Sequence, residues 1–179
     1  MADRSDYLLA DDAALLSQCD VDTYKASGPG GQHRNKVSSA VRLRHRLTGI
    51  SAHGDDSRSQ HDNKRLATRR LRMEIACRLR ESVDPRADLP AVVRECLFTP
   101  KKAAPGGSRR LEVGVKDHRF WPVAAVLLDV LAHFDGSLAD AAGHLGITTG
   151  NLAKLLRRER HLLTAAQGIR KRHGLGPLR

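Results

Sequence analysis

The feature that most constrains the fold is a change of hydrophobic periodicity near residue 59. Before it, polar and apolar residues alternate in short segments, which predicts strands at 20–26, 41–45 and 50–53. From Ser59 to about Ser82 the apolar residues recur at helical spacing, with arginines around the rest of the helix. This order predicts a small α+β domain of antiparallel strands followed by a long helix.

The second half of the sequence has mostly helical periodicity. Pro122 introduces apolar patterns that predict helices at 123–134, 138–145 and about 149–163. A Pro- and Gly-rich stretch precedes them and is predicted to hold a short helix at 91–97 and a strand at 111–115. The predicted organisation is an acidic N-terminal segment (1–17), an α+β domain (18–83), a linker (84–121) and a basic helical region (122–179).

Positive charge is concentrated outside the N-terminal segment. The chain carries 31 Lys and Arg against 20 Asp and Glu, a net charge of +11. Residues 1–22 hold six of the acids and one base, so the remainder carries 30 bases against 14 acids. Such an excess favours nucleic acid as the partner, because each neutralised phosphate releases counterions. A solvated charged surface is the alternative.

Composition argues against several classes of protein. Hydrophobic residues make up 40% of the chain and aromatic residues only 3%, so we expect a core of Leu, Val and Ala. No apolar run approaches the ~20 residues of a membrane span, and the acidic start lacks the pattern of a signal peptide. Cys19, Cys77 and Cys96 form no CxxC pair, which argues against disulfides and a cysteine zinc site. We expect a cytoplasmic protein without membrane contact.

Glycines interrupt the chain between the first two predicted strands. Residues 27–32 read Ser-Gly-Pro-Gly-Gly-Gln, and this composition rules out regular structure. The segment has neither the Gly-Lys-Ser/Thr of a P-loop nor a GxGxxG sequence, so both phosphate-cradling motifs are excluded. Composition alone leaves an ordinary exposed turn as the alternative.

The order of the residues is more specific than their composition. Residues 27–37 read SGPGGQHRNKV, followed by SAVRL at 39–43, TGI at 48–50 and RSQHDNK at 58–64. These blocks closely resemble the Gly-Gly-Gln catalytic domain of peptide chain release factors and of short ribosome-rescue hydrolases. The resemblance covers roughly residues 18–82, and it implies the same α+β fold.

The resemblance also implies a chemistry for the loop. Family members hydrolyse the ester joining peptide to tRNA in the ribosomal peptidyl-transferase centre. Gly30 and Gly31 would allow backbone conformations closed to other residues, and the backbone N–H of Gln32 would donate to the developing oxyanion or the leaving 3′ oxygen. The Gln32 amide would place the water but cannot act as a base. Gln32 is also a candidate for N-methylation by a glutamine methyltransferase.

The residues around the tripeptide are assigned to loop support and rRNA contact. They are Ser27, Gly28, Pro29, His33, Arg34, Asn35 and Lys36. Arg34 departs from the family pattern, which usually has a small apolar residue there. The arginine could add a phosphate contact or crowd the seat of the loop.

Residues 138–157 resemble a helix-turn-helix module. Ala142 in the first helix is followed four positions later by Gly146 in the turn, with apolar residues at the flanking positions. The side chains assigned to nucleic-acid contact are Thr149, Asn151, Lys154, Arg157 and Arg158, continued by Arg170, Lys171 and Arg172. A packed helical hairpin with solvated charges is the alternative. In rescue hydrolases a basic tail lies in the mRNA channel, but this tail is more apolar and could instead bind rRNA or tRNA.

A cluster of metal-ligand residue types has no metal-binding spacing. His53, Asp55, Asp56, His61 and Asp62 match no HExxH or similar site. We therefore expect neither a metal nor a cofactor.

The predicted function is codon-independent hydrolysis of peptidyl-tRNA on the ribosome, with large-subunit rRNA and peptidyl-tRNA as partners. Release factors read stop codons with large additional domains, for which 179 residues leave no room. The alternative is a non-catalytic nucleic-acid-binding regulator that uses the Gly-Gly-Gln domain only for docking. The sequence leaves open whether whole ribosomes or split large subunits are the substrate.

Overall fold

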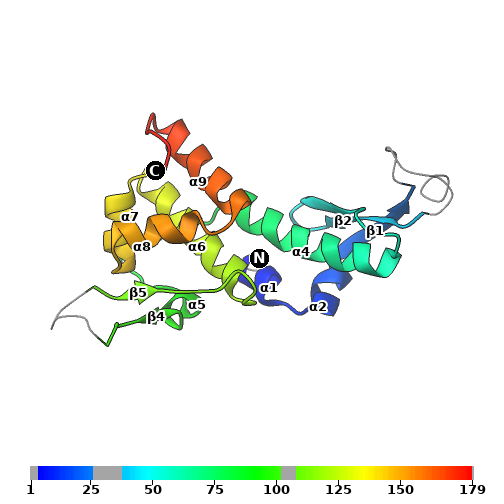
Figure 1. The fold of residues 1–179 in the computed structure, drawn as a ribbon, viewed down its shortest axis with the longest axis horizontal. Helices are drawn as coiled ribbons and strands as arrows, with labels where there is room; N and C mark the ends of the chain where they lie inside the picture. The colour runs from blue at the N-terminus through cyan, green and yellow to red at the C-terminus, as the bar shows by residue number, and fades with distance from the viewer. Residues whose placement is uncertain (1–3, 26–37, 102–107, 179) are drawn as a thin grey trace. The chain divides into compact units, whose positions relative to one another are not determined.

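A computed structural model describes residues 4–25, 38–101 and 108–178 (Figure 1). The chain forms two compact units, the N-terminal unit (1–75) and the C-terminal unit (76–179). The predicted fold class is confirmed, because a three-stranded antiparallel sheet with a long helix is followed by a mostly helical unit. Within the described ranges, no helix has the length and apolar character needed to cross a membrane.

The N-terminal unit contains two short helices, the sheet and most of the long helix. Its elements are α1 (Arg4–Leu9), α2 (Asp12–Ser17), β1 (Cys19–Tyr24), β2 (Ala40–His45), β3 (Ser51–Gly54) and α4 (Gln60–Arg78). The strand order is β1-β2-β3, with both pairs antiparallel. The long helix ends at Arg78, short of the predicted Ser82, because the N–H of Glu81 bonds the Asp129 carboxylate instead of a helical carbonyl.

The alternation that predicted β2 reflects burial. Val41 and Leu43 are buried on one face of the strand, whereas Arg42 and Arg44 are exposed on the other. Leu15, Leu71 and Ile75 are also fully buried in this unit. Burying these side chains is the main source of the unit's stability.

His45 is a polar exception in this core. Its Nε2 lies 3.1 Å from the Gln18 Oε1, and its Nδ1 lies 2.9 Å from the Thr48 hydroxyl. Since an amide oxygen only accepts, Nε2 donates to Gln18, and in the neutral imidazole Nδ1 then accepts from the Thr48 hydroxyl. Burial lowers the pKa of His45, and the positive charge of Arg46 lowers it further.

The C-terminal unit is built around a buried helix. Its elements are α5 (Ala91–Arg94), β4 (Leu97–Phe98), β5 (Arg110–Leu111), α6 (Phe120–His133), α7 (Leu138–Leu145), α8 (Thr149–Leu156) and α9 (Arg160–Arg172). Nearly every residue of α6 is buried, and leucine, valine and alanine fill most of the core, as expected from the composition. Pro122 lies in the first turn of α6, where its missing N–H costs no helical hydrogen bond.

Four predicted elements in this unit had wrong boundaries. The helix predicted at 123–134 begins earlier, at Phe120, and ends at His133. The helix predicted at 91–97 ends at Arg94, because Leu97 and Phe98 pair with β5 in a two-stranded antiparallel sheet. The strand predicted at 111–115 is observed as β5, which spans only Arg110–Leu111. The helix predicted at 149–163 is two helices, because the Glu159 carboxylate accepts from the N–H groups of His161 and Leu162 and starts α9.

Candidate functional site

The Gly-Gly-Gln loop itself falls outside the described residues. Gln32, Gly31 and Gly30 lie in the segment 26–37, as do the supporting residues. The sequence predictions for Ser27, Gly28, Pro29, His33, Arg34, Asn35 and Lys36 therefore remain predictions. The structure does describe the framework to which both ends of this segment are attached.

The two ends of the loop are fixed at one end of the sheet. β1 ends at Tyr24 and β2 begins at Ala40, and these two residues are directly paired in the antiparallel ladder. Residues paired in this way have Cα atoms about 4.5–5.5 Å apart. The chain therefore leaves the sheet and returns to it at the same place.

Asn63 ties this end of the sheet to the long helix. Its side chain is fully buried, and its Nδ2 donates to the carbonyls of Ser39 and Ser57, each at 2.8 Å. Its Oδ1 accepts from the N–H of Ser57 at 2.9 Å. One side chain thus holds the residue preceding β2 and the connection between β3 and α4.

Gly54 lets β3 lie directly against the backbone of α4. A Cβ atom at this position would lie 2.0 Å from the carbonyl oxygen of Asn63 and 3.0 Å from the N of Ala67. Only glycine fits such a contact. Sequence reasoning gave no role to Gly54 or Asn63, although a poor helix former near the start of a helix, inside the matched RSQHDNK block, was an available signal.

The residues considered as metal ligands have other partners. His53 Nδ1 lies 3.1 Å from the hydroxyl of Tyr24, and Arg70 forms ion pairs with Asp56 (2.9 Å) and Asp55 (3.8 Å). Across the described ranges, no group of three or more His, Cys, Asp or Glu side chains could hold a metal ion. The cluster acts as a brace between β3 and α4.

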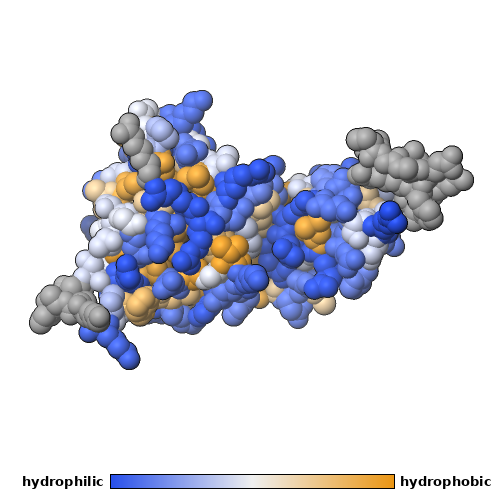
Figure 2. Space-filling view, viewed as in Figure 1, coloured by the Kyte–Doolittle hydropathy of each residue, from blue (hydrophilic) through white to orange (hydrophobic). Residues whose placement is uncertain are grey.

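The acids of the N-terminal unit are largely paired with its own arginines. Asp12 pairs with Arg72 at 2.5 Å, and Asp22 pairs with Arg42 at 2.7 Å. Six other bases pair with no acid in the part of the chain described, namely Lys25, Arg44, Arg58, Lys64, Arg65 and Arg69. Figure 2 shows hydrophilic residues over most of the visible face of this unit. The unpaired bases leave this surface positively charged.

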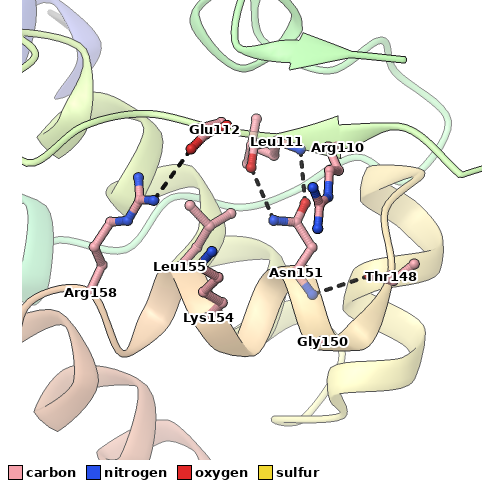
Figure 3. A pocket seen from close by; sticks show the side chains of 9 residues that line it. All are labelled: Arg110, Leu111, Glu112, Thr148, Gly150, Asn151, Lys154, Leu155 and Arg158. Carbon is pink, nitrogen blue, oxygen red and sulfur yellow. Dashed lines mark hydrogen bonds and ion pairs between the residues drawn. The ribbon is translucent and has the colours of Figure 1, made fainter. Parts of the chain in front are cut away.

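The side chains predicted to contact nucleic acid from α8 separate into two groups. Asn151 is bound to β5, because its Oδ1 accepts from the N–H of Leu111 at 2.8 Å and its Nδ2 donates to the Leu111 carbonyl at 3.1 Å (Figure 3). Arg158 donates to the Val113 carbonyl and lies 3.6 Å from Glu112. Both side chains face the strand.

The remaining predicted contacts are more accessible. Thr149 and Lys154 are exposed on α8, and Arg157 is exposed directly after it. On α9, Arg170 donates to the carbonyls of Gly136 and Gly176, whereas the other two predicted bases are exposed. Those two bases are Lys171 and Arg172. Whether any of these side chains contacts nucleic acid remains a prediction.

A pocket of about 270 Å³ lies between β5 and α8 (Figure 3). Thr148 caps the start of α8 by accepting from the N–H of Asn151, and Gly146 ends α7 in the left-handed conformation, with φ 67°. The residues lining the pocket are Arg110, Leu111, Glu112, Thr148, Gly150, Asn151, Lys154, Leu155 and Arg158. The lining carries three bases and one acid.

Comparison with known proteins finds a family that matches part of the chain. Residues 15–92 match the RF-1 domain family. This stretch is similar to an RF-1 domain. Over 55 residues the chain is 54% identical to peptide chain release factor 1 of Mycoplasma capricolum, and over 54 residues it is 57% identical to peptide chain release factor 2 of Acidovorax sp.. These alignments cover 31% and 30% of this chain but only 15% of either relative.

The stretch that matches the RF-1 domain contains the framework described above. The three strands, Gly54, Asn63 and the segment that includes Gln32 all lie within residues 15–92. The resemblance read from the sequence is thereby confirmed at the level of the family. The matches cover a small part of the relatives, so what those proteins do comes to this chain only as a proposal.

Proposed function

We propose that this chain hydrolyses the ester bond of peptidyl-tRNA in the peptidyl-transferase centre of the ribosome. The observation that carries the proposal is the RF-1 domain, whose match spans Gly30-Gly31-Gln32. The framework supports it, because the register of Tyr24 with Ala40 and the bonds of Asn63 fix both ends of the loop. Fixing both ends of a segment limits the space that it can search, which lowers the entropy cost of placing one of its backbone N–H groups at a reacting ester.

In the proposed reaction a water molecule attacks the carbonyl carbon of the ester. The bond from this carbon to the 3′ oxygen of the tRNA breaks, and a proton from the water reaches that oxygen. The backbone N–H of Gln32 donates to the oxygen on which negative charge develops, and the side-chain amide orients the water. Neither group titrates near neutral pH, so proton transfer falls to the tRNA hydroxyl and the ribosome.

The bases left unpaired on the N-terminal unit support ribosome binding. Arg65 and Arg69 are four residues apart on α4 and therefore lie on one face of it, close in sequence to the anchor Asn63. Contacts of such side chains with rRNA phosphates would position the loop and would weaken at high salt. This assigns docking to the surface of the RF-1 domain and chemistry to its loop.

We infer that release does not depend on a stop codon. The similarity to release factors 1 and 2 spans 15% of their length, and after it the chain continues into the C-terminal helical unit. That basic unit, with rRNA, tRNA or the empty mRNA channel as its partner, then takes the place of codon reading as the docking device.

The test is peptide release from ribosomes carrying peptidyl-tRNA on four substrates. These are an mRNA truncated at the P site, an intact stop codon, an intact sense codon and isolated large subunits. The proposal predicts release on the truncated mRNA without a requirement for a stop codon. Release confined to stop codons would contradict the codon-independent part, while the large subunits show whether split particles are the substrate.

A nucleic-acid-binding regulator is the second candidate. It is favoured by the succession of α7, a left-handed glycine at 146, a capping Thr148 and α8, which is the local order of a helix-turn-helix. Sequence-selective binding of duplex DNA that persists in Gln32→Ala, together with no release on any substrate, would favour this candidate over the hydrolase.

A further inference from the structure

We propose that the pocket between β5 and α8 binds a phosphodiester of an RNA backbone, with Arg110 and Lys154 as the contacting side chains. In this assignment Asn151 and Arg158 are positioning residues that hold the pocket open. The choice of RNA over DNA rests on the proposed ribosomal function, whereas the phosphate itself follows from the pocket.

The pocket is held at both ends by side chains of α8 and of the turn that follows it. Asn151 makes two hydrogen bonds to the backbone of Leu111, and Arg158, two residues past the end of α8, donates to the Val113 carbonyl. Lys154 follows Asn151 by three residues, a spacing that puts both on one face of the helix. Lys154 therefore lines the pocket between these two contacts (Figure 3).

The charge of the pocket favours an anion. The one acid in the lining, Glu112, lies 3.6 Å from Arg158 and largely neutralises it. Arg110 and Lys154 are exposed and pair with no acid in the described part of the chain, so they leave an excess positive charge. A phosphate oxygen can accept from both side chains.

The backbone at the start of α8 adds donors. The N–H groups of Thr149 and Gly150 belong to the first helical turn, and neither has an acceptor among the residues that the structure describes. A Cβ atom on Gly150 would meet nothing within 4 Å, so the space beside this turn is open. The aligned peptide dipoles there favour negative charge.

The turn between α7 and α8 contacts the chain just before β5. Arg109 forms an isolated bridge with Ile147, and its guanidinium lies 2.8 Å from where a Cβ of Gly146 would be. Glycine at 146 serves the left-handed turn, and the Arg109 side chain lies against it. This contact fixes the chain just before Arg110 enters the pocket.

The same geometry argues for backbone contact instead of base reading. An asparagine side chain can bind adenine with both its oxygen and its nitrogen, but both atoms of Asn151 are used by Leu111. The pocket volume of about 270 Å³ is large enough for a phosphate with part of its sugars. Binding should therefore depend on salt and little on sequence.

The test measures affinity of the full chain for a short RNA duplex by fluorescence anisotropy across a series of salt concentrations. Arg110→Ala and Lys154→Gln should each weaken binding about 5- to 10-fold and reduce the slope of log K against log salt by about 1. Lys116→Gln is the matched control, because it removes one exposed charge outside the pocket lining. Equal effects of Lys154→Gln and Lys116→Gln would overturn the assignment.

Asn151→Ala tests the positioning role. It should weaken binding in the wild-type background but have little further effect once Arg110 and Lys154 are both substituted, with the helical circular dichroism unchanged. An equal loss in both backgrounds would show that Asn151 does not act through the pocket.

Two further arms separate this inference from the proposed function. A DNA duplex of the same sequence that binds as tightly, or RNA binding that changes strongly with sequence, would overturn the assignment to an RNA backbone. Gln32→Ala should bind the RNA as the wild type does, and the assay involves no ribosome. A failure of peptide release therefore leaves this result unaffected.

Discussion

Replacing Asn63 tests whether one side chain fixes the base of the loop. In Asn63→Ala the carbonyls of Ser39 and Ser57 and the N–H of Ser57 lose the partners that lie 2.8–2.9 Å away. Each hydrogen bond contributes about 1 kcal/mol net, so the three together contribute about 3 kcal/mol. Alanine is the better helix former, and its higher helix propensity offsets about 0.6 kcal/mol of this loss in stability. The expected loss is about 2.5 kcal/mol.

The loss should be local, so the assay is amide hydrogen exchange of peptides covering β2 and β3. A loss of about 2.5 kcal/mol corresponds to roughly 70-fold faster exchange of amides that open with this part of the sheet. Amides of α6, in the C-terminal unit, should be unchanged. Gln60→Ala is the control, because Gln60 is exposed on the first turn of the same helix.

A second variant separates the two kinds of bond. Asn63→Asp keeps an acceptor for the Ser57 N–H but turns a carboxylate oxygen toward the two carbonyls, so it should accelerate exchange at least as much as Asn63→Ala. Exchange in β2 and β3 as slow as in wild type in both variants would refute the anchoring role of Asn63.

The remaining predictions concern stability. Gly54→Ala should destabilise the N-terminal unit by more than 2 kcal/mol in urea unfolding, because the added Cβ would overlap the backbone of α4. The Cβ of Gly168→Ala on α9 would have no atom within 4 Å, so this variant should be more stable by about 0.5–1 kcal/mol. The reverse order of stabilities would contradict this account. Asp129→Ala removes the buried carboxylate 3.2 Å from Arg80 and should cost about 3 kcal/mol, and a loss below 1 kcal/mol would show the pair to be dispensable. Burial, aided by the charge of Arg46, lowers the pKa of His45 below 6.5 in the folded protein. As the pH drops below 6.5 the unfolded chain therefore takes up this proton more readily than the folded protein, and the free energy of unfolding should fall. His45→Gln should make the free energy of unfolding less dependent on pH in this range, and an unchanged slope would contradict the assignment.

Local patterns predicted the elements whose stability comes from one amphipathic face. The alternation in β2 and the helical spacing in α7 gave their positions, and α7 begins and ends at the predicted residues, Leu138 and Leu145. The elements that were missed depend on partners distant in sequence. β4 exists because it pairs with β5, and Asn63 acts on Ser39, 24 residues earlier. No periodicity encodes such contacts.

The candidate site shows the same division. The order of the residues around Gln32 identified the family, which the RF-1 match confirms, but it gave no information about what holds the loop. On α8 the residue types alone could not separate Asn151 and Arg158, which bind β5, from the exposed Lys154. Side-chain direction decides that difference, and it is set by a strand that the sequence placed only approximately.

The central claim is that the backbone N–H of Gln32 promotes ester hydrolysis. The most direct test is the single-turnover rate of peptide release from ribosomes on truncated mRNA, with wild type, Gln32→Ala and Gln32→Pro compared at equal ribosome occupancy. Proline removes the N–H and should slow release about 10²- to 10³-fold. Alanine keeps the N–H but loses the amide that places the water, so it should also reduce release. Release by Gln32→Pro at the wild-type rate, or no release by a wild-type protein that occupies the ribosome, would contradict the account.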